Sequence, residues 1–179
     1  MLRNNLKFTA ADVKASAVFI KEVFMKRIIF FLPICLAIFI MIVVFYFSAQ
    51  PAAKSTEMSD PFVVFIMEKI HIGDAEKMAD FWQFAVRKSA HFYIYFLLGN
   101  MVILSCKNFK LKLYPVFAAV VCLLYAVSDE IHQYFVPGRS CELRDIMIDF
   151  CGALLPIIII SLIDYKENKN DRNKCIKNI

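Results

Sequence analysis

Hydrophobic residues are concentrated in four runs, each close to the length of a membrane-spanning helix. The runs are 28–47, 89–106, 113–127 and 146–163. A helix needs about 20 apolar residues to cross the hydrocarbon of a bilayer. The first run has that length and contains no charged residue. The other three are shorter or contain polar residues, so we expect them to pack inside a helical bundle rather than to cross lipid alone.

The segment between the first two runs has a different pattern. Asp60 and Pro61 are typical of a helix N-cap and of a first helical position, and apolar residues of 62–70 recur on one helical face. This pattern predicts a short amphipathic helix on the outer membrane surface, ending near Gly73. Asp74 is then placed to cap a longer helix that enters the membrane.

The composition excludes most soluble proteins. The chain has 179 residues, of which 60% are hydrophobic and 21% charged, and its mean hydropathy is +0.59. A soluble domain of this size could not cover so much apolar surface, and a disordered chain would be far more polar. Only four glycines are present and no Gly-rich loop, which removes dinucleotide-binding and P-loop folds. We therefore predict an all-α fold, a polytopic membrane bundle of four transmembrane helices with one short amphipathic helix on the outer surface.

The distribution of basic residues predicts the orientation. The segment before the first run, the one between the second and third, and the one after the fourth together carry 14 of the 21 Lys and Arg residues. The two remaining loops carry seven, together with ten of the sixteen carboxylates. Because cytoplasmic loops are enriched in Lys and Arg, both termini should be cytoplasmic. The net charge of +5 flanks apolar runs, so it indicates no nucleic-acid partner.

The chain divides into three parts. Residues 1–25 form either a mis-assigned start of translation or an amphipathic cytoplasmic arm, because Met25 precedes Lys26 and Arg27 as an ordinary start would. Residues 26–164 form the four-helix membrane domain. Residues 165–179 form a cytoplasmic tail rich in Lys and Asn.

Polar side chains gather near the outer ends of the spans and form a candidate pocket. Within each of three spans they recur at separations of three or four residues, and therefore share one helical face. A Lys or His on the lipid side would be costly, so this face should point into the protein. The candidate pocket residues are Lys88, His91, Tyr95, Asp129, His132, Gln133, Arg139, Asp145 and Asp149.

Several of these residues also have purely structural interpretations. His91 is compatible with a hydrogen-bonded packing residue between helices. Asp129 and Glu130 stand at a helix end, where solvated interface residues are common. Arg139 and Asp145 could form an ion pair that fixes the turn between two spans, or Arg139 could bind an anionic ligand.

A divalent metal is a further interpretation, since imidazole and carboxylate ligands suit zinc or manganese. The potential ligands are His91, Asp129, His132, Asp145 and Asp149. Asp149 lies roughly 10 Å inside its helix, where a carboxyl group must be protonated, paired or functional. No HExxH, DxD or CxxC motif accompanies these residues. The sequence therefore leaves the metal content, the cofactor and any catalytic residue open.

The polar residues stand in motifs that resemble those of the VanZ-like family of small bacterial membrane proteins. The matching residues are Ser48, Gln50 and Ser55 after the first span, Arg87, Lys88, His91 and Tyr95 entering the second, segment 128–140 with Glu130 and Pro137, and Arg144, Asp145, Asp149 and Gly152 in the fourth. The resemblance covers about residues 40–160. Cys141 and Pro156 depart from it, because glycine is usual there. Gly152 itself is expected at a close helix contact.

The resemblance implies a role in the cell envelope, since the family's namesake gives low-level resistance to the glycopeptide teicoplanin. We expect an outward polar pocket that binds a lipid-linked envelope component or an amphiphilic lipoglycopeptide. The rival hypothesis is an intramembrane metal-dependent hydrolase or transferase acting on lipid headgroups or lipid-linked precursors. Expected partners are membrane lipids and, as a further option, a second copy of the chain.

Overall fold

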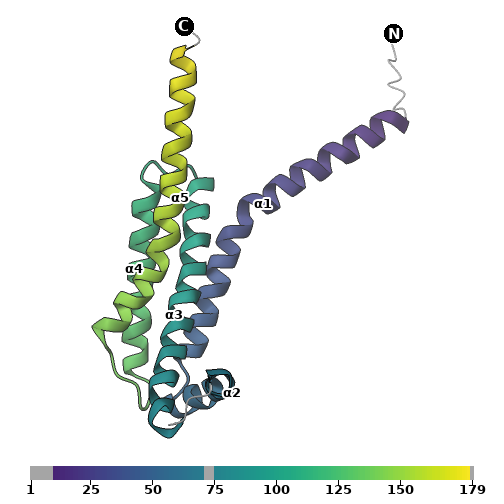
Figure 1. Cartoon of the computed structure of the whole chain (residues 1–179). Coiled ribbons are helices and arrows are strands. Elements are labelled where there is room, and N and C mark those ends of the chain that lie inside the picture. Colours follow the sequence, from purple (N-terminus) through teal and green to yellow (C-terminus); the bar gives the residue numbers. More distant parts are fainter. Residues whose placement is uncertain (1–9, 71–74, 178–179) are drawn as a thin grey trace, which may run out of the picture.

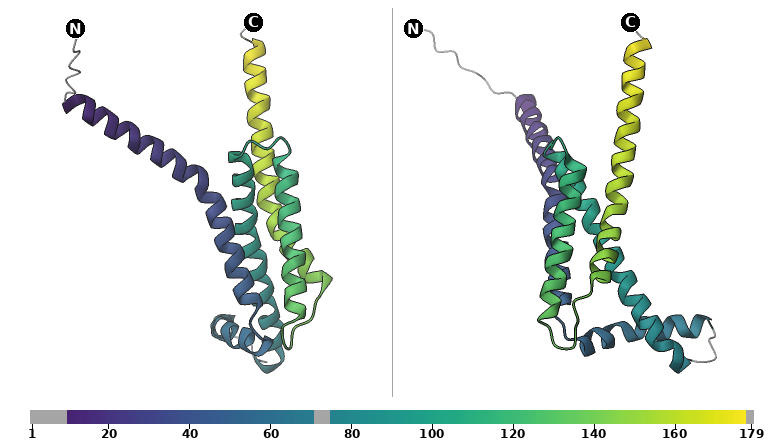
Figure 2. Two further views of the ribbon diagram at one scale, coloured as in Figure 1. Left: turned by 180° about the vertical axis from the view of Figure 1, so that it is seen from behind. Right: turned by 90° about the vertical axis from the view of Figure 1, so that its left-hand side faces the viewer.

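The computed structural model describes residues 10–70 and 75–177, and every regular element in these ranges is an α-helix. The helices are α1 (Ala10–Ser48), α2 (Ala52–Ile70), α3 (Ala75–Asn108), α4 (Tyr114–Tyr134) and α5 (Leu143–Lys177). Four of them, α1, α3, α4 and α5, form a bundle, and α2 lies across one end of it (Figures 1 and 2). These four are long and apolar enough to cross a membrane. The predicted all-α membrane bundle is confirmed.

Helices α3 and α5 run in the same direction, because α4 lies between them in the sequence and runs the opposite way. Three polar pairs join them, with sequence separations of 57, 58 and 57 residues. Because the separation changes by no more than one residue, the two helices keep nearly the same register along their contact. The pairs are Lys88 with Asp145, His91 with Asp149, and Lys107 with Asp164.

Two glycines bring the backbones of α3 and α5 into direct contact. A Cβ atom on Gly152 would lie 2.4 Å from the carbonyl oxygen of Phe92, and one on Gly99 would lie 2.4 Å from that of Ala153. Neither position has room for a side chain. Small residues at such contacts let membrane helices pack closely, so these glycines set the distance between α3 and α5.

Large apolar side chains cover the outside of the bundle. Phe39, Ile42 and Leu124 are 61%, 61% and 64% exposed, whereas Leu98 and Ile103 in the interior are at most 1% exposed. A protein surrounded by water does not present such an apolar circumference. The chain is therefore a multi-pass membrane protein whose outer surface faces lipid.

The start predicted for the amphipathic helix was wrong. Helix α2 begins at Ala52 rather than at Asp60, and Pro61 lies inside it. Pro51 precedes the first turn and its carbonyl accepts a hydrogen bond from the N–H of Ser55 at 3.0 Å. Pro61 is tolerated within the helix because it and Glu57, whose carbonyl loses its partner, are both exposed to solvent.

Helix α2 exposes its large aromatic side chains and buries smaller residues against the bundle. Phe62 and Phe65 are 65% and 58% exposed, while Ser59 and Val63 are buried against the bundle. Exposed aromatic rings of this kind are what a helix on a membrane surface would present to lipid. The predicted end near Gly73 and the cap at Asp74 lie outside the described residues.

The two terminal helices extend well beyond the bundle. Helix α1 begins at Ala10, so part of the predicted 1–25 arm continues directly into the first span, and its first half diverges from the other helices (Figure 1). Helix α5 continues to Lys177, so the predicted tail 165–179 is helical for most of its length. The N-terminal end of α1 and the C-terminal end of α5 lie on the same side as the α3–α4 turn, opposite to α2 (Figure 1).

Candidate functional site

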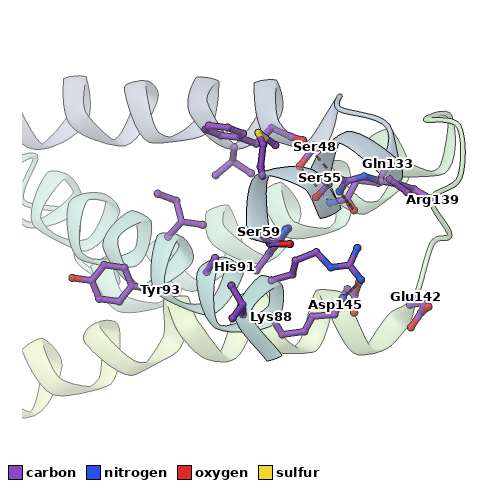
Figure 3. A pocket seen from close by; sticks show the side chains of 18 of the residues that line it. Ser48, Ser55, Ser59, Lys88, His91, Tyr93, Gln133, Arg139, Glu142 and Asp145 are labelled. Atoms are coloured by element: carbon purple, nitrogen blue, oxygen red, sulfur yellow. Dashed lines mark hydrogen bonds and ion pairs between the residues drawn. The ribbon is translucent and has the colours of Figure 1, made fainter. Parts of the chain in front are cut away.

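A pocket of about 610 Å³ opens at the α2 end of the bundle, between α1, α2, α3 and the segment that joins α4 to α5 (Figure 3). This volume is within the range of small-molecule sites. One part of the wall is apolar, with side chains such as Val44, Phe47 and Ile94. The polar residues of the wall are Ser48, Ser55, Ser59, Arg87, Lys88, His91, Gln133, Arg139, Ser140, Glu142 and Asp145.

Arg139 connects the α4–α5 segment to the end of α1. Its guanidinium donates hydrogen bonds to the carbonyl oxygens of Gln50 at 3.0 Å and Phe47 at 3.4 Å, and to the side-chain oxygen of Gln133 at 3.0 Å. The N–H of Ala52 also bonds the carbonyl of Pro137 in the same segment, at 3.4 Å. Arg139 therefore fixes the pocket wall through neutral acceptors.

Of the two interpretations of Arg139, the ion pair with Asp145 was wrong. Asp145 instead pairs with Lys88 of α3, and Arg144 lies 3.9 Å from its other oxygen. The physical reason is the path of the chain: segment 135–142 crosses toward α1 and carries Arg139 with it, whereas Asp145 lies in the first turn of α5, which faces α3. The two residues line different parts of the same pocket (Figure 3).

Glu130 stabilises the beginning of α5. Its side chain is 1% exposed and accepts a hydrogen bond of 2.6 Å from the backbone N–H of Glu142. Asp129 is equally buried, at 2% exposure, and accepts a hydrogen bond of 3.1 Å from Gln133. The interpretation of Asp129 and Glu130 as solvated interface residues was therefore wrong, because α5 and α3 pack over this end of α4.

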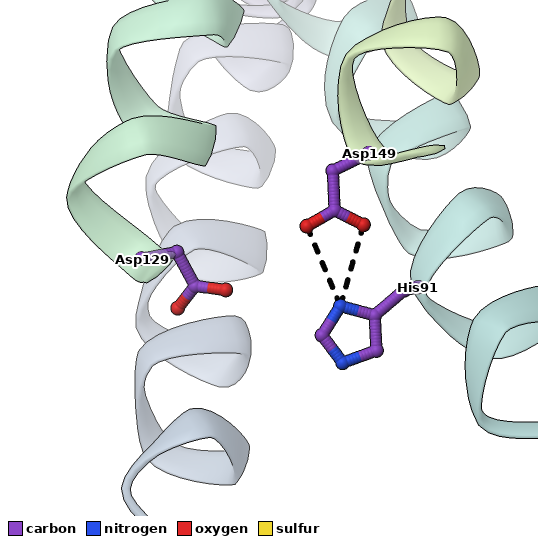
Figure 4. Close-up of side chains that lie close together, drawn as sticks. All are labelled: His91, Asp129 and Asp149. Carbon is purple, nitrogen blue, oxygen red and sulfur yellow. Dashed lines mark hydrogen bonds and ion pairs between the residues drawn. The ribbon is translucent and has the colours of Figure 1, made fainter. Parts of the chain in front are cut away.

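Beside the pocket, three helices contribute one side chain each to a His–Asp cluster, formed by His91 of α3, Asp129 of α4 and Asp149 of α5 (Figure 4). One ligand atom of each lies within 4.8 Å of the other two. The Nδ1 atom of His91 is 3.3 Å and 3.4 Å from the two carboxylate oxygens of Asp149. Since His91 also lines the pocket, it links the pocket to the cluster.

Two of the predicted site residues lie near the cluster without being part of it. The hydroxyl of Tyr95 is buried and has no hydrogen-bond partner, and this side chain is 0% exposed. The ring of His132 stacks on Phe45 of α1 with 4.1 Å between ring centroids. Of the five potential metal ligands, the structure thus brings together His91, Asp129 and Asp149 and leaves His132 and Asp145 outside.

A family comparison agrees with these motifs: the family described as VanZ/LLP1 matches residues 30–164. The chain belongs to the VanZ-like family. No curated protein and no solved structure gives a significant match. The matched range contains the whole VanZ-like pocket and the His–Asp cluster, and it begins within α1 and ends at Asp164 of α5.

Two ionisable groups of the VanZ-like pocket lie in the segment outside the spans. The Ser140 hydroxyl, which donates to Glu142 at 3.0 Å, and the nearby Arg144 lower the pKa of the Glu142 carboxyl. Partial burial lowers the pKa of Arg139, and the nearby Arg87 adds to this effect. An arginine nevertheless stays protonated in proteins, so the pocket keeps this positive charge.

Sequence reasoning named Ser55 of α2 as a motif residue but missed the rest of the contribution of α2 to the VanZ-like site. Ser59 lines the pocket, and Asp60 accepts a hydrogen bond of 2.7 Å from Gln83 of α3, which holds α2 against the bundle. It also missed a polar cluster at the opposite end, where Asp164 accepts hydrogen bonds from Lys107 at 2.7 Å and Tyr114 at 2.5 Å. The available signal was a charged residue at the end of each of two apolar runs.

Proposed function

We propose that this VanZ-like protein lies in the cell membrane with both termini in the cytoplasm and binds an amphiphilic, lipid-linked envelope component in its pocket. The pocket then opens toward the outer leaflet, where such components and lipoglycopeptides meet the membrane. By occupying or withdrawing that component, the protein lowers susceptibility to teicoplanin-type drugs. An acyl tail gives such a drug membrane affinity of about 0.8 kcal/mol per buried CH₂ group, which concentrates it at this depth.

The combination of apolar and positively charged side chains in the pocket wall supports this proposal most strongly. Val44 and Phe47 provide apolar surface suited to a hydrocarbon chain, and Arg139 and Lys88 add positive charge to the same pocket. The hydrogen bonds of Arg139 end on neutral oxygens, so its charge remains available to an anionic headgroup. Lys88 is already paired with Asp145 and contributes less.

Filling the pocket tests the proposal. Ala90 lines the pocket, and the adjacent Ser89 is exposed outside it, so Ala90→Phe and Ser89→Phe add the same ring at neighbouring positions of α3. In a Gram-positive host, at matched membrane abundance, we expect wild type and Ser89→Phe to raise teicoplanin tolerance and Ala90→Phe to lose that effect. Vancomycin serves as the comparison drug. The proposal is wrong if wild type changes neither susceptibility, or if both variants behave alike.

The His–Asp cluster favours a second candidate function, a metal-dependent hydrolase or transferase acting on lipid headgroups or lipid-linked precursors. In this reading Asp129 and Asp149 act as metal ligands or general base, and Arg139 holds a phosphate. Incubation of purified protein with labelled lipid-linked precursors and divalent metals tests it. Release of no headgroup with any metal supplied would exclude this second candidate and leave the binding function standing.

A further inference from the structure

We propose that the His–Asp cluster is a binding site for one divalent cation, of the zinc or manganese type, at the inner side of the pocket. The second candidate function rests on such a site, whereas the binding function does not, because the ligands belong to the bundle itself. The test of the site measures bound metal rather than activity or drug tolerance.

The arrangement of the three ligands fits a cation. Ligand atoms of His91, Asp129 and Asp149 lie within 4.8 Å of one another, and the three side chains point toward a common space (Figure 4). Around an ion with bonds of about 2.1 Å, ligand atoms are at most about 4.2 Å apart. Small side-chain rotations therefore close the site without movement of the helices.

The carboxylate of Asp129 is held in place, yet one of its two oxygens has no hydrogen-bond partner. Oδ2 of Asp129 accepts the hydrogen bond from Gln133, which fixes the carboxylate, and Gln133 is in turn held by Arg139. Oδ1 of Asp129 is buried and has no hydrogen-bond partner. A buried carboxylate oxygen without a partner is costly, and a metal ion removes that cost. Partners that orient a ligating carboxylate are usual around metal sites.

The charges around the cluster favour a cation as well. Asp129 and Asp149 are each 2% exposed, and both lie within membrane-spanning helices. The neighbouring positive group Lys88 forms its ion pair with Asp145 instead. His91 alone cannot balance two carboxylate charges, whereas a divalent ion can.

The ligand types restrict the class of metal. One imidazole and two carboxylates suit zinc or manganese better than calcium or magnesium, which prefer oxygen alone. Three protein ligands leave at least one coordination position for water or for a group of a bound molecule. Because His91 also lines the pocket, an ion held by it would border the pocket.

Metal binding to the purified full chain in detergent tests the proposal. After removal of metal with a chelator, bound Zn²⁺ and Mn²⁺ are measured by equilibrium dialysis and elemental analysis. Co²⁺ is added as a spectroscopic probe, because a thiolate site would show a sulfur-to-cobalt charge-transfer band and a His–Asp site would not. This distinguishes the cluster from the six free cysteines.

Three variants make the test specific. Asp129→Asn keeps an oxygen for the Gln133 hydrogen bond but removes the charge, and His91→Gln removes the imidazole. His132→Ala removes a histidine that lies outside the cluster and serves as the matched control. Circular dichroism and gel filtration of each metal-free variant show that it is folded, and Asp129→Asn remains informative if His91→Gln does not fold.

We expect wild type and His132→Ala to bind one equivalent of Zn²⁺ or Mn²⁺ per chain, with no thiolate band for Co²⁺. The affinity should fall at least tenfold, on the order of the loss seen when ligation is disturbed, in Asp129→Asn and His91→Gln. Absence of binding to wild type would overturn the site. Binding that both cluster variants retain, or a thiolate band, would place the metal elsewhere and would overturn it equally.

Discussion

Among single residues, Arg139 has the widest structural influence on the pocket. It reaches Gln50, Phe47 and Gln133 at once, and Gln133 then bonds both Ser48, at 3.3 Å, and Asp129. The planar guanidinium can serve these separate acceptors, which an ammonium on a lysine could not. Through this chain of contacts Arg139 holds α1, α4 and the pocket wall together.

The Lys88–Asp145 pair gives a prediction at the residue scale. The two side chains are 21% and 16% exposed, so replacing one of them leaves a poorly solvated charge behind. We expect Lys88→Met to lower the free energy of unfolding in detergent by about 2 kcal/mol. The double variant Lys88→Met with Asp145→Leu should recover most of that loss, since no unpaired charge remains.

Thermal or denaturant unfolding of both variants measures this effect. Arg144→Met is the control, because its side chain is 59% exposed and its ion pairs should contribute little. A double variant that is no more stable than Lys88→Met would show that Asp145 is stabilised by something other than Lys88.

Among the helices, the α3–α5 contact determines the geometry beneath the pocket. Gly152→Ala would place a methyl carbon 2.4 Å from the carbonyl oxygen of Phe92, which is backbone and cannot rotate away. We expect this variant to lose about 1–3 kcal/mol of unfolding free energy, the usual cost of overpacking. Cys151→Ala, at the exposed neighbouring position, should unfold like wild type. Equal unfolding free energies of the two variants would contradict this prediction, because α3 and α5 could then move apart without loss of stability.

A side-chain hydrogen bond and two buried side chains hold the middle of helix α2 against the bundle. Asp60 accepts the hydrogen bond from Gln83, and Ser59 and Val63 supply buried surface. We expect Asp60→Ala to increase amide hydrogen exchange within 53–68 and to leave α3, α4 and α5 unchanged, because weakly held elements open locally. Exposed Glu57 provides the control, as Glu57→Ala. Unchanged exchange in Asp60→Ala would show that burial alone holds α2.

The sequence predicted elements better where the membrane dictates them than where the chain turns. Long apolar runs must become helices in lipid, which is why all four spans were found. Asp60 and Pro61 resemble a helix start whether or not one is present, and the real start depends on Pro51 and on the carbonyl of Pro137, a long-range contact. Local pattern carries no information on such a contact.

The same distinction applies to the candidate site. Helical spacing correctly put Asp145 and Asp149 on one face of α5, since this follows from the period of the helix. It could not show that Asp145 meets Lys88 while Arg139 crosses to α1, because the path of the loop decides that. Nor could it show that Asp129 approaches His91, which depends on the packing of three helices.

For the whole molecule, the N-terminal end of α1 and the C-terminal end of α5 lie on the side opposite to the pocket (Figure 1). The bias of Lys and Arg predicts that this side is cytoplasmic. In single-cysteine variants on intact cells, a membrane-impermeant maleimide should label Cys141 and should reach Cys175 only after permeabilisation. Cys151, exposed within the apolar part of α5, should resist labelling in both conditions. The reverse pattern would place the pocket in the cytoplasm and contradict the proposed function.

The glycine contact between α3 and α5 has a consequence for how the His–Asp cluster would respond to a bound ion. The close backbone contact of Gly152 with Phe92 lies next to the His91–Asp149 pair. It therefore fixes the distance between the helices that carry His91 and Asp149. Asp129 belongs to α4 and is free of that restraint. Capture of an ion would therefore turn the Asp129 side chain toward a stationary pair, and the hydrogen bonds of Gln133 would transmit that rotation to Arg139 at the pocket rim.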